Sequence, residues 1–121
     1  MARCDQGYLC DVCGAEVETI TESDLYLRFM IGEIQSSRLL STPDRHIRCN
    51  PVTAQFIDHP DFSPPVTVEG DFDRRLFDPA DITPRVALVT RGWLRLKQLA
   101  ALPEPLPLAQ YPLPEFHRAS R

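Results

Sequence analysis

The chain has 121 residues, 43% of them hydrophobic and 25% charged, and a formal net charge of −4. This size and composition predict one domain with a modest core and argue against a second domain. No apolar run approaches the roughly 20 residues that span a bilayer, and polar residues follow Met1 where a signal peptide would be apolar. We therefore expect a cytosolic protein without a membrane segment.

Two pairs of soft ligands organise the first half of the sequence. Cys10 and Cys13 form a C-x2-C turn closed by Gly14, and His46 and Cys49 form an H-x2-C pair before a predicted helix. Together they predict one tetrahedral zinc site, whose four protein ligands leave no open position for activated water. The metal is therefore expected to be structural. Redox-active thiols and unliganded core cysteines are the alternatives for these residues.

Cys4 is a further thiol, six positions before Cys10. It is close enough in sequence to replace His46 as a ligand, and it can equally be a neighbouring or free thiol. Because the two compact pairs already complete a tetrahedral set, the primary prediction is a site without Cys4.

The segment after the first pair favours a short strand and then a helix. Residues 15–21 contain β-branched residues in partial alternation, which is typical of a strand. The run Thr21-Glu22-Ser23-Asp24 resembles a capping box and predicts that a helix begins there. Gly32 is expected to weaken or end that helix. Four apolar residues have the spacing of one buried helix face: Leu27, Met30, Ile31 and Ile34.

Asn50 and Pro51 are typical of the first positions of a helix, which we expect over residues 52–58. Cys49 would lie at the amino end of that helix, where the helix dipole favours a thiolate. Its expected core residues are Phe56 and Ile57.

A C-x2-C-G knuckle followed by two ligands at the start of a helix resembles the treble-clef group of zinc domains. The resemblance covers about residues 4–59, and 32 residues, 14–45, separate the ligand pairs. We predict a helix where members of that group usually have a β-hairpin. The resemblance implies that Cys10 and Cys13 are knuckle ligands and that His46 and Cys49 are helix-end ligands. It selects no function, because treble clefs bind nucleic acids or proteins and, rarely, catalyse reactions.

The middle of the chain predicts a proline-rich connection over residues 58–65 and a short strand at Val66–Gly70. Carboxylates and an imidazole cluster there in sequence, which would suit a hydrolytic or metal site. No motif fixes their geometry, so a surface loop is favoured. The residues concerned are Asp58, His59, Asp61, Asp71 and Asp73.

Thr83 and Pro84 predict the start of a helix that continues to about residue 102. Residues 84–102 hold four basic and no acidic side chains, whereas residues 1–83 hold 15 acidic and 7 basic ones. Arg91 and Arg95 share one helix face and could contact phosphates, acidic side chains of the same domain, or solvent. A buried stripe is expected on another face, at Val86, Val89, Trp93, Leu96 and Ala100.

Proline-rich residues 103–121 predict an extended tail in polyproline II geometry. Its apolar residues, Tyr111 among them, could lie along the domain or bind a partner's aromatic groove. We therefore divide the chain into a zinc-stabilised domain, 1–102, and a tail, 103–121.

These patterns predict a small α+β domain with a treble-clef-like knuckle, short strands and about three helices. No nucleotide-binding, serine-hydrolase or zinc-protease motif is present, so a non-catalytic role is favoured. The expected function is an adaptor that binds another protein. Nucleic-acid binding through the basic helix, with Arg91 and Arg95, is the first alternative, and a C-x2-C thiol redox protein is the second.

Overall fold

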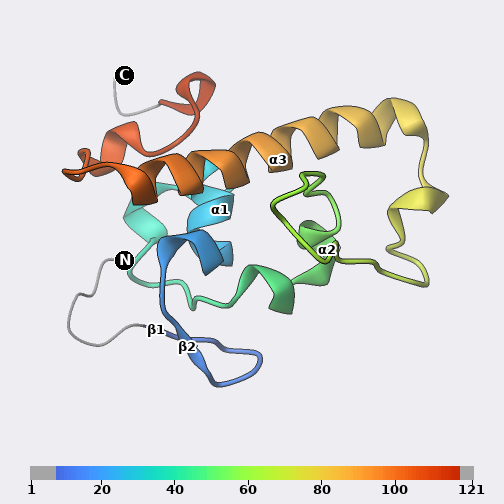
Figure 1. The fold of residues 1–121 in the computed structure, drawn as a ribbon, viewed down its shortest axis with the longest axis horizontal. Helices are drawn as coiled ribbons and strands as arrows, with labels where there is room; N and C mark the ends of the chain where they lie inside the picture. The colour runs from blue at the N-terminus through green and yellow to red at the C-terminus, as the bar shows by residue number, and fades with distance from the viewer. Residues whose placement is uncertain (1–7, 118–121) are drawn as a thin grey trace.

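The computed structural model describes residues 8–117 and contains three α-helices and one two-stranded antiparallel sheet. This content agrees with a small α+β domain of about three helices. Figure 1 shows α3 running along the molecule, with α1 and α2 on one side of it and the β-hairpin farther away. The elements are β1 (Tyr8–Leu9), β2 (Glu16–Val17), α1 (Asp24–Met30), α2 (Pro51–Ala54) and α3 (Pro79–Ala101).

The β-hairpin presents the first ligand pair at its turn. Tyr8 pairs with Val17 and Leu9 with Glu16, so residues 10–15 form the connection between the strands. Gly14 has a φ of +80°, a conformation that favours glycine, and its N–H donates to the Cys10 carbonyl at 2.9 Å. The strand predicted over residues 15–21 is therefore much shorter than expected, and a 3₁₀ turn, η1 (Ile20–Glu22), follows it.

Helix α1 begins later than its sequence pattern predicted. Its N-cap is Ser23, whose Oγ accepts a hydrogen bond from the Tyr26 amide at 3.1 Å. Thr21 instead shares a hydrogen bond with Thr19, 2.8 Å between hydroxyl oxygens. The expected end is confirmed, because α1 stops at Met30 and Gly32 follows with a φ of +81°.

Helix α3 begins at Pro79, five residues before the predicted start. The Asp78 carboxylate accepts a hydrogen bond from the Ala80 amide at 2.9 Å, and Pro79 occupies the first turn. This is the same cap-then-proline signal that Thr83 and Pro84 carry, so the earlier copy starts the helix and Pro84 lies inside it. Of the predicted stripe, Val89, Trp93 and Leu96 are buried, Val86 is half-buried and Ala100 is exposed.

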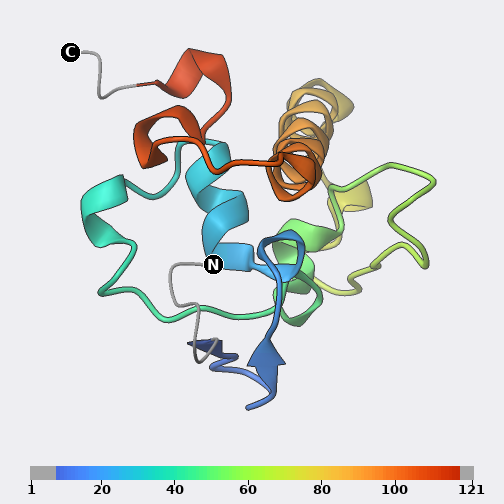
Figure 2. The ribbon, with the colours of Figure 1, turned by 60° about the vertical axis from the view of Figure 1, so that its left-hand side comes forward.

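Residues 103–117 pack on the rest of the chain, which is one of the two arrangements expected for the apolar residues of the tail. Leu113 is 6% exposed and belongs to the main core, and its N–H donates to the Met30 carbonyl at 3.0 Å. Tyr111 packs against Tyr26 and Phe29, with ring centroids 6.2 and 6.3 Å apart. Figure 2 shows this segment folded over α1 and beside α3. Prolines restrict the backbone, but they leave the apolar side chains between them free to pack.

Two further elements differ from expectation. Helix α2 is a single turn that ends at Ala54, although Phe56 and Ile57 beyond it are buried as predicted. The strand predicted at Val66–Gly70 has no partner among residues 8–117 and is not part of a sheet. None of the described helices combines the length and the apolar character needed to cross a bilayer.

Candidate metal centre

The two predicted ligand pairs meet in space. The ligand atoms of Cys10, Cys13, His46 and Cys49 all lie within 4.8 Å of one another. Neighbouring ligand atoms around a tetrahedral zinc ion with sulfur and imidazole ligands are about 3.6–3.8 Å apart, so small side-chain movements would complete such a shell. Within residues 8–117 this is the one group of three or more metal-binding side chains that could hold an ion. Cys4 lies outside the described residues.

The backbone of the knuckle holds the Cys10 sulfur as an acceptor. Cys10 is 3% exposed, and its Sγ receives the amides of Val12, Cys13 and His46 at 3.4, 3.5 and 3.4 Å. Burial alone would raise the pKa of this thiol, but the amide hydrogen bonds outweigh burial and lower its pKa to about 6. Cys10 is therefore prepared as a thiolate, which is the form that binds metal.

The imidazole of His46 is oriented with one nitrogen toward the thiols. Nδ1 lies 3.4 Å from the sulfur of Cys13 and 3.8 Å from that of Cys49. Nε2 lies 2.9 Å from the backbone carbonyl of Glu16, which can only accept, so Nε2 carries the proton. This contact fixes the tautomer that leaves the Nδ1 lone pair among the sulfurs, an arrangement typical of a metal-bound histidine.

Cys49 is positioned differently from the sequence expectation. It is the last residue of a 3₁₀ turn, η3 (Ile47–Cys49), and the α2 helix after it has only one turn, too short for a substantial dipole. Burial, followed by contact with the Cys10 and Cys13 thiols, raises the pKa of Cys49 to about 12. A metal ion at this point would replace the Cys49 proton, as metal binding to thiols generally does.

No protein-family model, curated protein or solved structure matches this chain.

A buried polar network joins α1 to the second ligand pair, and sequence reasoning missed it. The carboxylate of Asp44, 2% exposed, accepts hydrogen bonds from the Ser23 hydroxyl at 2.9 and 3.0 Å and from the Leu25 amide at 3.3 Å. The carboxylate of Asp24, fully buried, accepts from Asn50 Nδ2 at 3.0 Å. Burial raises the pKa of Asp24. These contacts hold the chain on both sides of His46 and Cys49 against the amino end of α1.

The basic side chains of the long helix contact their own domain. Arg91 pairs with Glu115 at 2.7 Å, and Arg95 donates to the Tyr111 carbonyl at 2.9 Å. The three predicted partner-binding residues therefore lie together, but they tie the C-terminal segment to α3. The other two cations of this helix also have acidic partners: Arg85 pairs with Glu33 at 2.6 Å and Lys97 with Asp61 at 3.0 Å.

The acidic and histidine residues of the middle segment do not form a common site. Asp58 pairs with Arg74 at 3.2 Å, and Asp61 binds Lys97. The ring of His59 packs against Trp93, with centroids 5.6 Å apart. His59 Nδ1 accepts from the Asp61 amide at 3.1 Å and lies 3.9 Å from the Asp61 carboxylate. Asp58 and Asp73 instead pair with different arginines, so the segment forms no common site, in agreement with the loop interpretation.

Proposed function

We propose that the chain binds one structural zinc ion through Cys10, Cys13, His46 and Cys49. The observation that carries this proposal is the fixed imidazole of His46, whose Nδ1 faces two of the thiols while Nε2 donates to the Glu16 carbonyl. Three thiolates and one imidazole favour zinc over the hard cations that prefer oxygen. Four protein ligands leave no position for substrate or water, so the ion would hold the β-hairpin to the second ligand pair.

The zinc-stabilised domain is proposed to act as a non-catalytic adaptor that binds another protein. Two observations support this over nucleic-acid binding: the chain is acidic overall, and each of the four cations on α3 already has a partner in its own domain. A thiol redox role is less well supported, because the histidine bridges both ligand pairs and the Cys10 sulfur is almost fully buried.

Metal content and cobalt spectra of the purified full chain test the site. We expect one zinc per chain in protein purified without chelator, and a cobalt-substituted protein with tetrahedral and thiolate charge-transfer absorption. Cys49→Ser should lose this spectrum, whereas Cys4→Ser should retain it. Protein without metal, or a native disulfide that includes Cys10 or Cys13, would contradict the zinc proposal.

The same sample separates adaptor from nucleic-acid binder. An adaptor should purify with a protein-like ratio of absorbance at 260 and 280 nm. If the cations of α3 contacted phosphates, affinity for RNA or DNA would fall steeply with salt, with a log-log slope of roughly −2 to −4. Such binding, abolished in an Arg91→Glu, Arg95→Glu variant that remains folded, would favour the nucleic-acid alternative.

A further inference from the structure

Residues 65–69 form a straight segment whose backbone is unpaired. The segment contains no helix, turn or bend, and burial alternates along it: Val66 and Val68 are half-buried, while Thr67 and Glu69 are exposed. This period of two is the pattern of a strand with one face on the core. Val66 packs against the main core. The sequence prediction of a strand here therefore fails only because no second strand lies beside it.

The hydrogen-bonding groups of this segment have no partner within residues 8–117. Its four amide N–H groups, from Val66 to Glu69, and its five carbonyl groups, from Pro65 to Glu69, make no hydrogen bond to the rest of the chain. Successive residues of an extended segment point these groups to opposite edges, so the amides of Val66 and Val68 face one edge and those of Thr67 and Glu69 face the other. Each edge is a template for an added strand. Gly70, with a φ of +95°, ends the segment on one side, and Pro64 and Pro65 limit it on the other.

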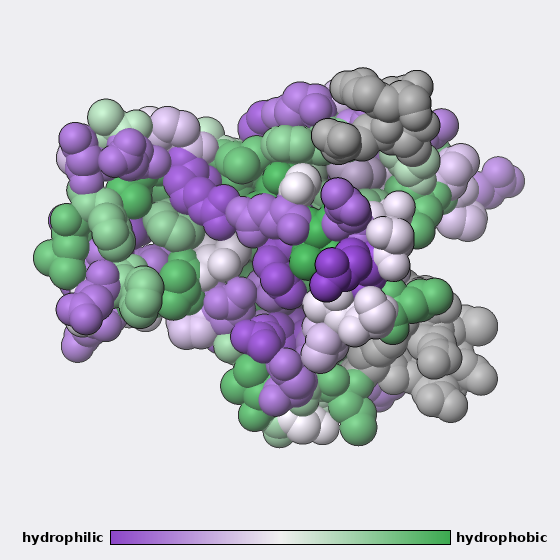
Figure 3. All heavy atoms as spheres, turned by 180° about the vertical axis from the view of Figure 1, so that it is seen from behind, coloured by the Kyte–Doolittle hydropathy of each residue, from purple (hydrophilic) through white to green (hydrophobic). Residues whose placement is uncertain are grey.

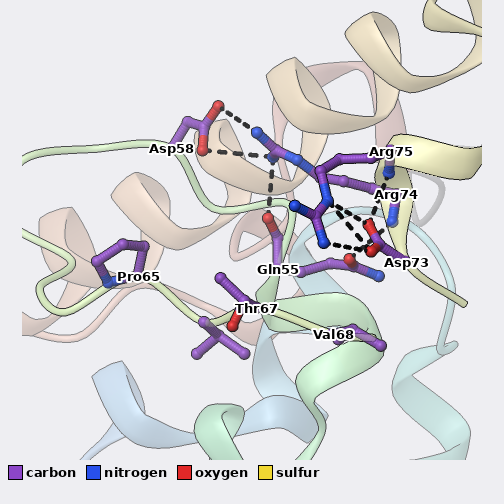
Figure 4. Close-up of a pocket in the computed structure, with 9 residues that line it drawn as sticks. Gln55, Asp58, Pro65, Thr67, Val68, Asp73, Arg74 and Arg75 are labelled. Carbon is purple, nitrogen blue, oxygen red and sulfur yellow. Dashed lines mark hydrogen bonds and ion pairs between the residues drawn. The ribbon is translucent and has the colours of Figure 1, made fainter. Parts of the chain in front are cut away.

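A cavity runs along the segment and leaves room beside it. It has a volume of about 330 Å³ and is lined by four consecutive segment residues, 65–68. Figure 4 shows Pro65, Thr67 and Val68 on one side and the Asp58–Arg74 ion pair on the other. Gln55 holds the loop that forms the far wall, since its side chain accepts from the Arg74 amide at 3.0 Å and donates to the Phe72 carbonyl at 2.8 Å.

The surroundings of the segment are apolar and acidic. Phe72, Leu76 and Phe77 are 62%, 67% and 45% exposed, unusually high for large apolar residues close together in sequence. Seen from behind, hydrophobic side chains gather at the end of the molecule that carries this loop (Figure 3). Residues 66–81 contain five acidic and two basic side chains. Both arginines are neutralised locally, Arg74 by Asp58 and Arg75 by Asp73.

We propose that residues 66–69 pair with an extended, basic peptide of a partner protein, which adds a strand and places apolar side chains beside Phe72 and Leu76. The charge selects this occupant, because Glu69 and Asp71 form no ion pair among the described residues. Arg75 attracts Glu69 at longer range, but Arg75 is already paired with Asp73 at 2.6 Å. A second copy of the chain would instead bring two like-charged segments together. The inference rests on the proposed adaptor role, and it identifies the surface and the chemistry of the partner.

A dodecamer peptide display library, selected on zinc-replete full-length protein, tests the proposal. Recovered peptides should alternate apolar residues with lysine or arginine. Thr67→Pro and Val68→Pro each remove one free amide donor, on opposite edges, without breaking an intramolecular hydrogen bond. The substitution on the paired edge should weaken peptide binding about tenfold, whereas Thr67→Ala should change it less than about twofold. N-methylation of one alternate set of peptide amides should cause a similar loss, and this second measurement does not depend on the folding of a protein variant.

Charge reversal provides a matched pair of variants. Glu69→Lys combined with Asp71→Lys should weaken the basic peptides about tenfold at low salt, whereas Glu104→Lys, an exposed acid elsewhere, should leave affinity unchanged. Failure to recover peptides, equal binding to both Thr67→Pro and Val68→Pro, or insensitivity to N-methylation of both alternate sets of peptide amides would overturn the proposal. A dimer in sedimentation that Thr67→Pro dissolves would assign the surface to a second copy and overturn the proposed occupant.

Zinc measured on the same samples distinguishes this inference from the proposed metal site. Strand-like peptide binding by protein that contains no metal would retain the surface and reject the zinc proposal. Zinc-loaded protein that recovers no peptide would reject the surface and leave the zinc site standing.

Discussion

Substitution of alanine for Gly32 tests whether the C-terminal segment is part of the folded domain. Gly32 closes α1 with a φ of +81°, which costs an alanine about 1–2 kcal/mol. A Cβ at this position would lie 2.5 Å from Cδ1 of Phe116, where ordinary carbon contacts are about 3.5–4.0 Å. The ring would have to move by about 1 Å and lose part of its packing, which adds about 1–2 kcal/mol. We therefore expect Gly32→Ala to lower the free energy of unfolding by about 2–4 kcal/mol.

Gly70→Ala is the matched control for this substitution. Gly70 also has a positive φ, +95°, but a Cβ there would meet nothing within 4 Å. Only the backbone cost of about 1–2 kcal/mol should remain. Both free energies are measured by urea denaturation of zinc-replete protein, followed by circular dichroism.

A double-mutant cycle isolates the contact with Phe116. In a Phe116→Ala background the excess cost of Gly32→Ala over Gly70→Ala should disappear, because the ring that obstructs the new methyl group is absent. Equal costs for the two glycine substitutions in the parent protein, or an excess that persists without the ring, would refute the packing of this segment on α1.

Four further outcomes are expected. Chelation should unfold the first half of the chain, since structural zinc contributes on the order of 10 kcal/mol in small domains. An unchanged melting temperature after chelation would show that the metal does not stabilise the fold. Leu113→Ala should cost about 2–4 kcal/mol in urea denaturation, and a loss below about 1 kcal/mol would indicate a loose tail. Arg91→Glu should destabilise the protein at low salt, and adding Glu115→Arg to that variant should restore stability. No restoration in the double variant would show that the pair does not form in solution. Hydrogen bonds from Arg75 lower the pKa of Asp73 to about 2, so the contribution of Asp73 to stability is present above about pH 4 and is lost as the pH falls toward 2. In Asp73→Asn, the melting temperature should therefore depend less on pH between about 4 and 2.

The ligand cluster could be predicted from sequence because its signal is local. Each pair sits within four residues, so the spacing alone brings Cys10 close to Cys13 and His46 close to Cys49. The meeting of the two pairs followed from the chemistry of a tetrahedral site. The supporting contacts were not predictable in this way, because the bond between Ser23 and Asp44 joins residues 21 positions apart with no motif.

Two features of the fold could not be predicted from the sequence, for similar physical reasons. Two cap-and-proline signals, at Asp78–Pro79 and Thr83–Pro84, both fit a helix start, and local sequence does not decide between them. The C-terminal segment has the composition of an extended tail. Its placement depends on the contact between Phe116 and Gly32, which are 84 residues apart and are related only by tertiary packing.

The position of α1 between the two ligand pairs has a consequence for how stability is measured. A metal held by Cys13 and His46 joins residues 33 positions apart and encloses α1 in a loop. If the thiols keep the metal when the domain unfolds, the denatured chain is cross-linked and its conformational entropy is lower by the equivalent of about 4 kcal/mol. Denaturation with excess zinc would then end in a cross-linked unfolded ensemble, whereas protein unfolded in the presence of chelator would have no such cross-link. The free energies of unfolding of the parent chain and of a variant in α1 should accordingly be compared at one fixed concentration of free metal.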